Sequence, residues 1–232
     1  MTIAIMQPYF LPYIGYFQLL NAVDKFVLYD DVNFINRGWI NRNNMLIGGK
    51  SHLFTLPLAN ASQNRLIYDV QLVEDVSGRK KLLKTIQQAY QKAPYFQAVF
   101  PLLEEIVYLD TQNIAELIYK SLLKLAEYLE IRTEIVRSSR VYGNSDLKGQ
   151  DRILDICKKE GATQYINPIG GQELYDKSQF EQKGIRLNFI KSLLRPYPQF
   201  KNAFVPWLSI LDVLMFNDMD RTRELLQDFE LV

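Results

Sequence analysis

The sequence predicts an α/β protein of three layers, built on a mainly parallel, doubly wound sheet with a helical insertion. Residues 3–6 form a short apolar run typical of a buried strand, and Phe26–Tyr29 forms a second one. Between them, apolar residues from Tyr13 onward recur roughly at helical spacing. Such a β–loop–α–β unit indicates parallel strands. The same succession recurs in the second half of the chain, which favours a doubly wound sheet.

The middle of the chain is expected to be mostly helical. Ser51–Leu58 and Ile67–Val73 read as strands, and the amphipathic stretches that follow predict three helices, at Ser77–Tyr90, Phe96–Tyr108 and Ile114–Leu129. Asn113 precedes the last of them and is its expected N-cap. No linker rich in Pro, Gly or Ser divides the chain. We therefore expect one domain, residues 1–232, with a mostly helical insertion at about 77–130.

The second half repeats the pattern of the first. Apolar runs and breakers predict a strand at Ile131–Ser138, a helix at Asp151–Glu160, a strand at Gln164–Asn167, a helix from about Glu173 and a last strand at Ile185–Ile190. Trp207–Met215 reads as an apolar helix, and the tail to Val232 as a charged helix.

Composition excludes several function classes. The chain has 232 residues, 48% hydrophobic and 23% charged, with 27 Lys plus Arg against 26 Asp plus Glu. A net charge of +1 attracts neither nucleic acid nor a membrane surface. A single cysteine, Cys157, cannot form an internal disulfide and reads as a core residue, while a lone His52 excludes a multi-histidine metal site. With no signal peptide and no apolar run of about 20 residues, we expect a cytoplasmic protein that binds no nucleic acid and has no membrane span. Its oligomeric state stays open.

One long stretch carries a specific resemblance. Residues 6–34 read MQPYFLPYIGYFQLLNAVDKFVLYDDVNF, and they are followed by Trp39, Asn41-Arg42-Asn43, Leu56-Pro57-Leu58 and Ser209-Ile210-Leu211-Asp212. These features resemble the WbqC-like family, from near residue 3 to about residue 217. The resemblance implies a role in bacterial surface-polysaccharide (O-antigen) synthesis and leaves the reaction open.

The segment Tyr13-Ile14-Gly15-Tyr16 also resembles, in position and in its glycine, the motif of HxGH-type nucleotidyltransferases. That resemblance implies a HUP/nucleotidyltransferase-like first unit, in which the motif contacts nucleotide phosphates at a helix N-terminus. Here tyrosines replace both histidines, and a tyrosine is no cation at neutral pH. We assign Tyr16 a catalytic role and Gln7, Tyr13 and Gly15 a substrate-binding role. Ring packing at the helix start is the alternative.

Asp30 and Asp31 follow the second predicted strand, where α/β proteins place working groups, and are the other catalytic candidates. Two carboxylates in one cleft can hold a magnesium ion or divide acid and base roles. No other cofactor is expected. Because neighbouring strand residues point to opposite faces, only one of the pair can readily face a given cleft. A helix cap, or an ion pair with Arg37 or Arg42, is the alternative.

Three further segments are candidates for substrate binding. Arg37 and Arg42 present forked donors for phosphate, with Trp39 as a stacking face and Asn41 and Asn43 as amide partners; a solvated loop is the alternative. Beyond another strand, hydroxyl and cationic groups suited to phosphate occur at Ser138, Ser139, Arg140 and Lys148. Paired glycines that allow close backbone approach to a ligand occur at Gly170 and Gly171.

These features predict a transferase of surface-polysaccharide synthesis that acts on an activated, nucleotide-linked sugar or on its amino substituent. The alternatives are a nucleotidyltransferase-like enzyme with the tyrosine-substituted motif, and a non-catalytic binding or scaffold protein of the same pathway. An enzyme is expected to have a deep cleft that brings together Gln7, Tyr16, Asp31 and Arg42, and a scaffold a large exposed apolar patch.

Overall fold

The computed structural model describes all residues 1–232 and contains a six-stranded sheet in the order β10-β9-β8-β1-β2-β7. Five strands run parallel, and β10 is antiparallel to β9. The strands are β1 (Thr2–Met6), β2 (Lys25–Leu28), β7 (Glu134–Val136), β8 (Gln164–Pro168), β9 (Arg186–Ser192) and β10 (Phe229–Leu231). The predicted doubly wound sheet is confirmed, and its strand order reverses between β1 and β8, the place where such sheets bind ligands.

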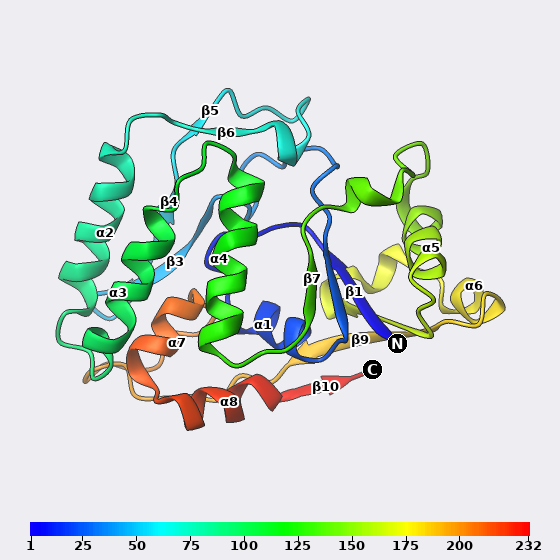
Figure 1. Cartoon of the computed structure of the whole chain (residues 1–232). Helices are drawn as coiled ribbons and strands as arrows, with labels where there is room; N and C mark the ends of the chain where they lie inside the picture. Colours follow the sequence, from blue (N-terminus) through cyan, green and yellow to red (C-terminus); the bar gives the residue numbers. More distant parts are fainter.

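Helices cover both faces of this sheet (Figure 1). The core on one face includes residues of α1 (Ile14–Asn21), α4 (Ile114–Tyr128), α7 (Ile210–Phe216) and α8 (Met219–Gln227), and the core on the other face includes residues of α5 (Gly149–Lys159) and α6 (Lys177–Gln182). The alternation along β1 shows why: Ala4 joins a core of 50 buried residues on the first face, whereas Ile3 and Ile5 join a core of 13 on the second. The three-layer architecture is therefore confirmed.

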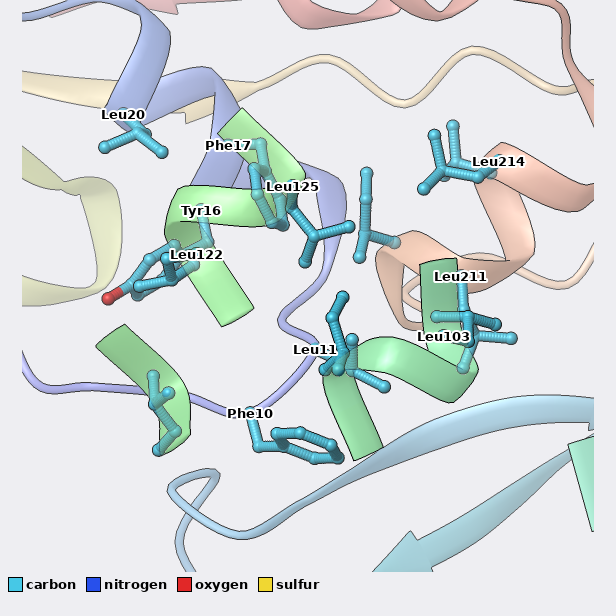
Figure 2. Close-up of a cluster of buried hydrophobic side chains, with 14 of the residues drawn as sticks. Phe10, Leu11, Tyr16, Phe17, Leu20, Leu103, Leu122, Leu125, Leu211 and Leu214 are labelled. Atoms are coloured by element: carbon cyan, nitrogen blue, oxygen red, sulfur yellow. The ribbon is translucent and has the colours of Figure 1, made fainter. Parts of the chain in front are cut away.

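The segment expected to be mostly helical contains α2 (Ser77–Tyr90), α3 (Phe96–Val107) and α4. As expected, Asn113 caps α4: its Oδ1 accepts a hydrogen bond of 3.1 Å from the backbone N–H of Glu116. Leu122 and Leu125 of α4 belong to the same core cluster as Tyr16 and Phe17 of α1 (Figure 2). Thus α4 is packed directly into the main core.

Two small antiparallel sheets precede these helices. They pair β3 (Arg42–Ile47) with β4 (Lys50–Thr55) and β5 (Leu58–Ala59) with β6 (Gln71–Leu72). The prediction of a strand over Ile67–Val73 is wrong in part. Residues 67–69 form a 3-10 turn, and within this segment only β6 is a strand. Ile67 and Val70 are both fully buried, and a tight helical turn places residues three apart on one side.

The end of the chain also differs from expectation. The charged helix ends at Gln227, and residues 229–231 extend the main sheet as β10. The buried Gln18 side chain explains the stop, since its Nε2 donates to the carbonyls of Leu225 and Asp228 at 2.8 and 2.9 Å. The helix expected from Trp207 begins instead at Ile210, after Ser209 as its cap.

After β8, the helix expected from about Glu173 begins later than predicted. Residues 169–174 form a 3-10 turn, and α6 begins only at Lys177, where Asp176 accepts a hydrogen bond from the N–H of Ser178 at 2.9 Å. No helix in the structure is long and apolar enough to cross a membrane.

Candidate functional site

An aromatic pocket lies beside the carboxyl end of β1. It has a volume of about 330 Å³ and is formed by residues of the β1–α1 loop, of the loop and first half of β3, and of the loop before α7. These are Tyr9, Pro12, Tyr13, Trp39, Asn43, Asn44 and Trp207. Three distant parts of the chain thus supply aromatic rings and amide groups to one cavity, a common composition for a small-molecule site.

Gly15 explains how Tyr13 is oriented in this pocket. A Cβ at position 15 would clash with the Tyr13 ring, so the ring lies directly against the glycine. The same ring meets Trp207 edge to face, with centroids 5.9 Å apart. The glycine of the Tyr-Ile-Gly-Tyr segment therefore makes room for a tyrosine ring.

The loop beneath the pocket is held in a rare backbone conformation. Leu11 has φ 44°, and its carbonyl accepts hydrogen bonds from Asn43 Nδ2 at 3.0 Å and from Ser209 Oγ at 2.6 Å. The side chains of Phe10 and Leu11 point into the core (Figure 2). Trp207 also has a positive φ, of 60°. Strained residues that the surrounding structure holds in place are typical of functional sites.

Arg42 and Trp39 form a pair at the rim of the pocket. The guanidinium carbon of Arg42 lies 5.8 Å from the Trp39 ring centroid, and Arg42 Nε donates to the carbonyl of Gly38 at 2.7 Å. The terminal nitrogens of Arg42 make no hydrogen bond within the protein. They are free to bind an anionic group next to the rings.

Other predicted residues near this pocket are engaged in the fold. Tyr16 is 2% exposed, and its hydroxyl donates to the carbonyl of Gln7 at 3.0 Å. Asn41 Nδ2 donates to the carbonyl of Leu56 at 2.7 Å, and Asn43 is bound to Leu11. The structure thus brings Tyr13, Trp39, Arg42 and Asn43 together, with Gly15 beneath the Tyr13 ring, and it places Tyr16 in the core below them.

A second cavity, the polar basin, lies at the carboxyl ends of β2 and β7. Its volume is about 290 Å³. It is lined by Asp30, Tyr68, Gln71, Thr111, Gln112, Asn113, Ala115, Glu116, Arg137, Ser138 and Arg140. Most of these side chains carry hydrogen-bonding groups, so the basin suits a small polar molecule.

The two aspartates face different sides of the sheet, as expected for strand neighbours. Asp30 lines the polar basin and accepts a hydrogen bond of 2.6 Å from Ser138 Oγ. Asp31 accepts from Ser139 Oγ and forms a buried ion pair with Arg152 of α5, on the other face. The structure therefore brings Asp31 to neither the aromatic pocket nor the basin, and the expected cleft of Gln7, Tyr16, Asp31 and Arg42 is not formed.

Electrostatics distinguish Asp30. Burial raises the pKa of its carboxyl above the ordinary value, and the Ser138 hydroxyl and the Arg140 charge oppose this rise. A magnesium ion shared by both aspartates does not fit this arrangement, because both oxygens of Asp31 are taken by Ser139 and Arg152. No three His, Cys, Asp or Glu side chains gather closely enough to hold a metal. A magnesium ion would have to bind through Asp30.

The remaining predicted residues lie apart from both cavities. Arg37 is exposed with φ 60°, and Lys148 is exposed at the start of α5. Gly170 is exposed and Gly171 is buried. A Cβ at position 171 would clash with the Asn167 side chain. These positions share no cavity with the aromatic rings.

Sequence reasoning missed several residues that line the cavities, among them Tyr9, Asn44, Tyr68 and Trp207. Only Trp207 had a signal in the sequence, because it is one of just two tryptophans and directly follows Pro206, although it was expected to begin a helix. An exposed tryptophan in a loop is unusual unless it contacts a ligand or partner. The others lie among ordinary-looking residues and become neighbours only through folding.

The fold and the pocket define a class: a doubly wound α/β protein with an aromatic pocket at the carboxyl edge of its sheet. The model of the WbqC-like protein family matches residues 7–224, and the chain belongs to this family. The chain is similar to an uncharacterized protein, Rv1507c, of Mycobacterium tuberculosis (strain ATCC 25618 / H37Rv), with 29% identity over 218 residues that cover 93% of each chain. No solved structure matches it.

Proposed function

We propose that this WbqC-like protein is a cytoplasmic transferase of surface-polysaccharide (O-antigen) synthesis that acts on a nucleotide-linked sugar or its amino substituent. The pathway follows from the family resemblance. The observation that carries the substrate class is the aromatic pocket, in which Tyr9, Tyr13, Trp39 and Trp207 surround a cavity with Arg42 at its rim. Aromatic faces stack on sugars and bases, and a guanidinium binds the phosphates that join them.

The proposed roles of the aspartates differ. Asp30 is the acid–base candidate, because it lines the polar basin, the second cavity at this edge of the sheet, and burial raises the pKa of its carboxyl. Asp31 and Tyr16 act as positioning residues, since the first holds Arg152 and Ser139 and the second supports the chain at Gln7.

Two alternatives each have an observation in their favour. A nucleotidyltransferase-like activity is favoured by the strand order and by the glycine-bearing start of α1 directly after β1. The burial of Tyr16 counts against it. A non-catalytic binding role is favoured by the composition of the aromatic pocket, whose seven lining residues carry neither a carboxylate nor an imidazole.

The test uses the intrinsic fluorescence of the protein. Its only two tryptophans, Trp39 and Trp207, are 45% and 53% exposed and both line the aromatic pocket. Titration with uridine, guanosine, cytidine and thymidine diphosphate sugars is expected to give a saturable change in emission with at least one of them. If none changes the emission, or if Trp39→Phe binds that sugar as before, the proposal is overturned.

A second measurement separates the transferase from its alternatives. Consumption of the bound nucleotide sugar in the presence of candidate acceptors supports the transferase, and formation of that nucleotide sugar from a nucleoside triphosphate supports the nucleotidyltransferase. Binding without any turnover supports the non-catalytic role.

A further inference from the structure

The polar basin has two charges without a full partner. Of its four charged residues, Glu116 and Arg137 form an ion pair, with Oε2 and Nε 2.7 Å apart, and Lys120 adds a contact of 3.6 Å to Glu116. Asp30 and Arg140 form no direct ion pair with any residue. The basin therefore presents one negative and one positive group that a ligand can bind.

Asp30 offers one oxygen to the basin. Its side chain is deeply buried, and Oδ1 accepts the hydrogen bond from Ser138. Oδ2 accepts no hydrogen bond from the protein. The only side-chain polar atoms that are fully buried and have no hydrogen-bond partner are Gln18 Oε1 and Ser192 Oγ, so Asp30 Oδ2 is not fully buried. Oδ2 therefore stays accessible, and the polar basin is the cavity that Asp30 lines.

Arg140 offers the opposite charge in a fixed orientation. Its guanidinium carbon lies 4.3 Å from the Tyr68 ring centroid, and Nε donates to Ser138 Oγ at 3.0 Å. The terminal nitrogens make no hydrogen bond within the protein. Ser138 Oγ also donates to Asp30. The same hydroxyl therefore bridges the Arg140 and Asp30 side chains and fixes the position of both charges.

We propose that the polar basin binds a small amino acid as its zwitterion, with the carboxylate on Arg140 and the ammonium on Asp30. A guanidinium held by its Nε leaves two terminal nitrogens for a carboxylate, which they grip in bidentate fashion. An ammonium on the neighbouring carbon then reaches Asp30 Oδ2, and Gln71, Thr111 and Gln112 line the rest of the basin. A phosphate dianion suits the basin less, because Asp30 repels it. The inference rests on the proposed function only for the role of this ligand as a second substrate.

The first experiment screens binding to the full-length protein. Each common L-amino acid is added at neutral pH, and the melting temperature is recorded, because a ligand of the folded state raises it by mass action. The best ligand is then measured by titration calorimetry. It is compared with the amine that lacks its carboxylate and the acid that lacks its ammonium. Each analogue is expected to bind at least about tenfold more weakly, since it loses a charge-assisted contact.

Variants then assign the site. Arg140→Gln and Asp30→Asn are each expected to weaken binding of that amino acid at least about tenfold. Arg137→Gln is the matched control: it removes the same charge from the same basin, but Arg137 is already held by Glu116, so binding is expected to change less than about threefold. Arg140 is exposed, so its variant retains the fold and carries the test even if Asp30→Asn is unstable.

The inference is overturned if no amino acid raises the melting temperature, or if Arg140→Gln binds as tightly as the parent protein. It is also overturned if the amine or the acid alone binds as well as the zwitterion. The fluorescence test of the aromatic pocket is independent. Amino-acid binding without nucleotide-sugar binding would keep this inference while the proposed function fails, and the reverse result would do the opposite.

Discussion

At the scale of single residues, the aromatic pocket depends on side chains that no ligand needs to touch. Gly15 leaves room for the Tyr13 ring, and Asn43 and Ser209 hold the strained carbonyl of Leu11 from two directions. The residues that form the wall are thus oriented by small and polar neighbours. Two substitutions separate this support from direct binding.

Gly15→Ala is expected to reduce ligand affinity with little loss of stability. The new methyl group displaces the Tyr13 ring, which lines an open cavity and can turn away, and alanine favours the helix over glycine by about 1 kcal/mol. Tryptophan fluorescence titration measures the affinity, and thermal unfolding the stability. A variant that binds the nucleotide sugar normally would show that the ring is not a binding surface.

Arg42→Lys is expected to weaken ligand binding by roughly 1–3 kcal/mol while the melting temperature changes little. Lysine keeps the charge but loses both the forked donor and the Nε hydrogen bond to Gly38. Arg65→Lys, an exposed arginine in a neighbouring loop, is the matched control and is expected to bind normally. If Arg42→Lys bound like the control, Arg42 would not be a ligand contact, and if it unfolded, Arg42 would have a structural role.

At the scale of elements, the carboxyl ends of β2 and β7 are joined by two parallel Asp–Ser hydrogen bonds that lead to different surroundings. Asp30 with Ser138 opens to the polar basin, whereas Asp31 with Ser139 is closed by Arg152 of α5. The Arg152 guanidinium also lies 4.9 Å from the Tyr29 ring centroid. One pair is therefore available to a ligand, and the other connects a helix to the sheet.

Arg152→Met is expected to destabilise the protein by about 3–5 kcal/mol, because it leaves the Asp31 carboxylate buried without its cation. Chemical denaturation measures this loss. The double variant Asp31→Asn/Arg152→Met is expected to be less destabilised than the sum of the two single variants, since the unpaired charge is then absent. Simple additivity would contradict a direct ion pair.

At the scale of the whole molecule, the sheet separates two cores that belong to different helices. Cys157 of α5 lies in the smaller core, while Trp39 and Trp207 lie at the aromatic pocket on the side of the larger one. We propose that the chain, residues 1–232, is one domain with a helical insertion at about 77–130. In that case the two cores on either side of the sheet unfold in one transition.

Alkylation of Cys157 tests this proposal. Burial raises the pKa of the Cys157 thiol to about 12, so the native thiol is almost entirely protonated at about pH 8 and reacts slowly, whereas the unfolded thiol has a pKa of about 8.5. In a urea series, the midpoint of iodoacetamide labelling is expected to coincide with that of tryptophan fluorescence. Separate midpoints would show two units that unfold independently.

Periodicity determined most of the fold from the sequence. The apolar runs at β1 and β2, the helical spacing in α4 and the cap at Asn113 are local features, and each was predicted because neighbouring residues impose it. The tail was predicted less well. Its charged pattern favours a helix to the end, but the edge of β9 offers backbone partners to residues 229–231, and only the folded sheet creates that edge.

The candidate site divides in the same way. The sequence by itself indicated Tyr13, Trp39, Arg42 and Asp30, because rings, guanidinium groups and carboxylates after strands carry recognisable chemistry. Only the tertiary structure decided that Trp207 faces Tyr13 across nearly two hundred positions, that Asp31 is occupied by Arg152, and that Arg140 lies on Tyr68 beside Asp30. Chemical type is a property of a residue, but a partner distant in the chain is a property of packing, which no local pattern records.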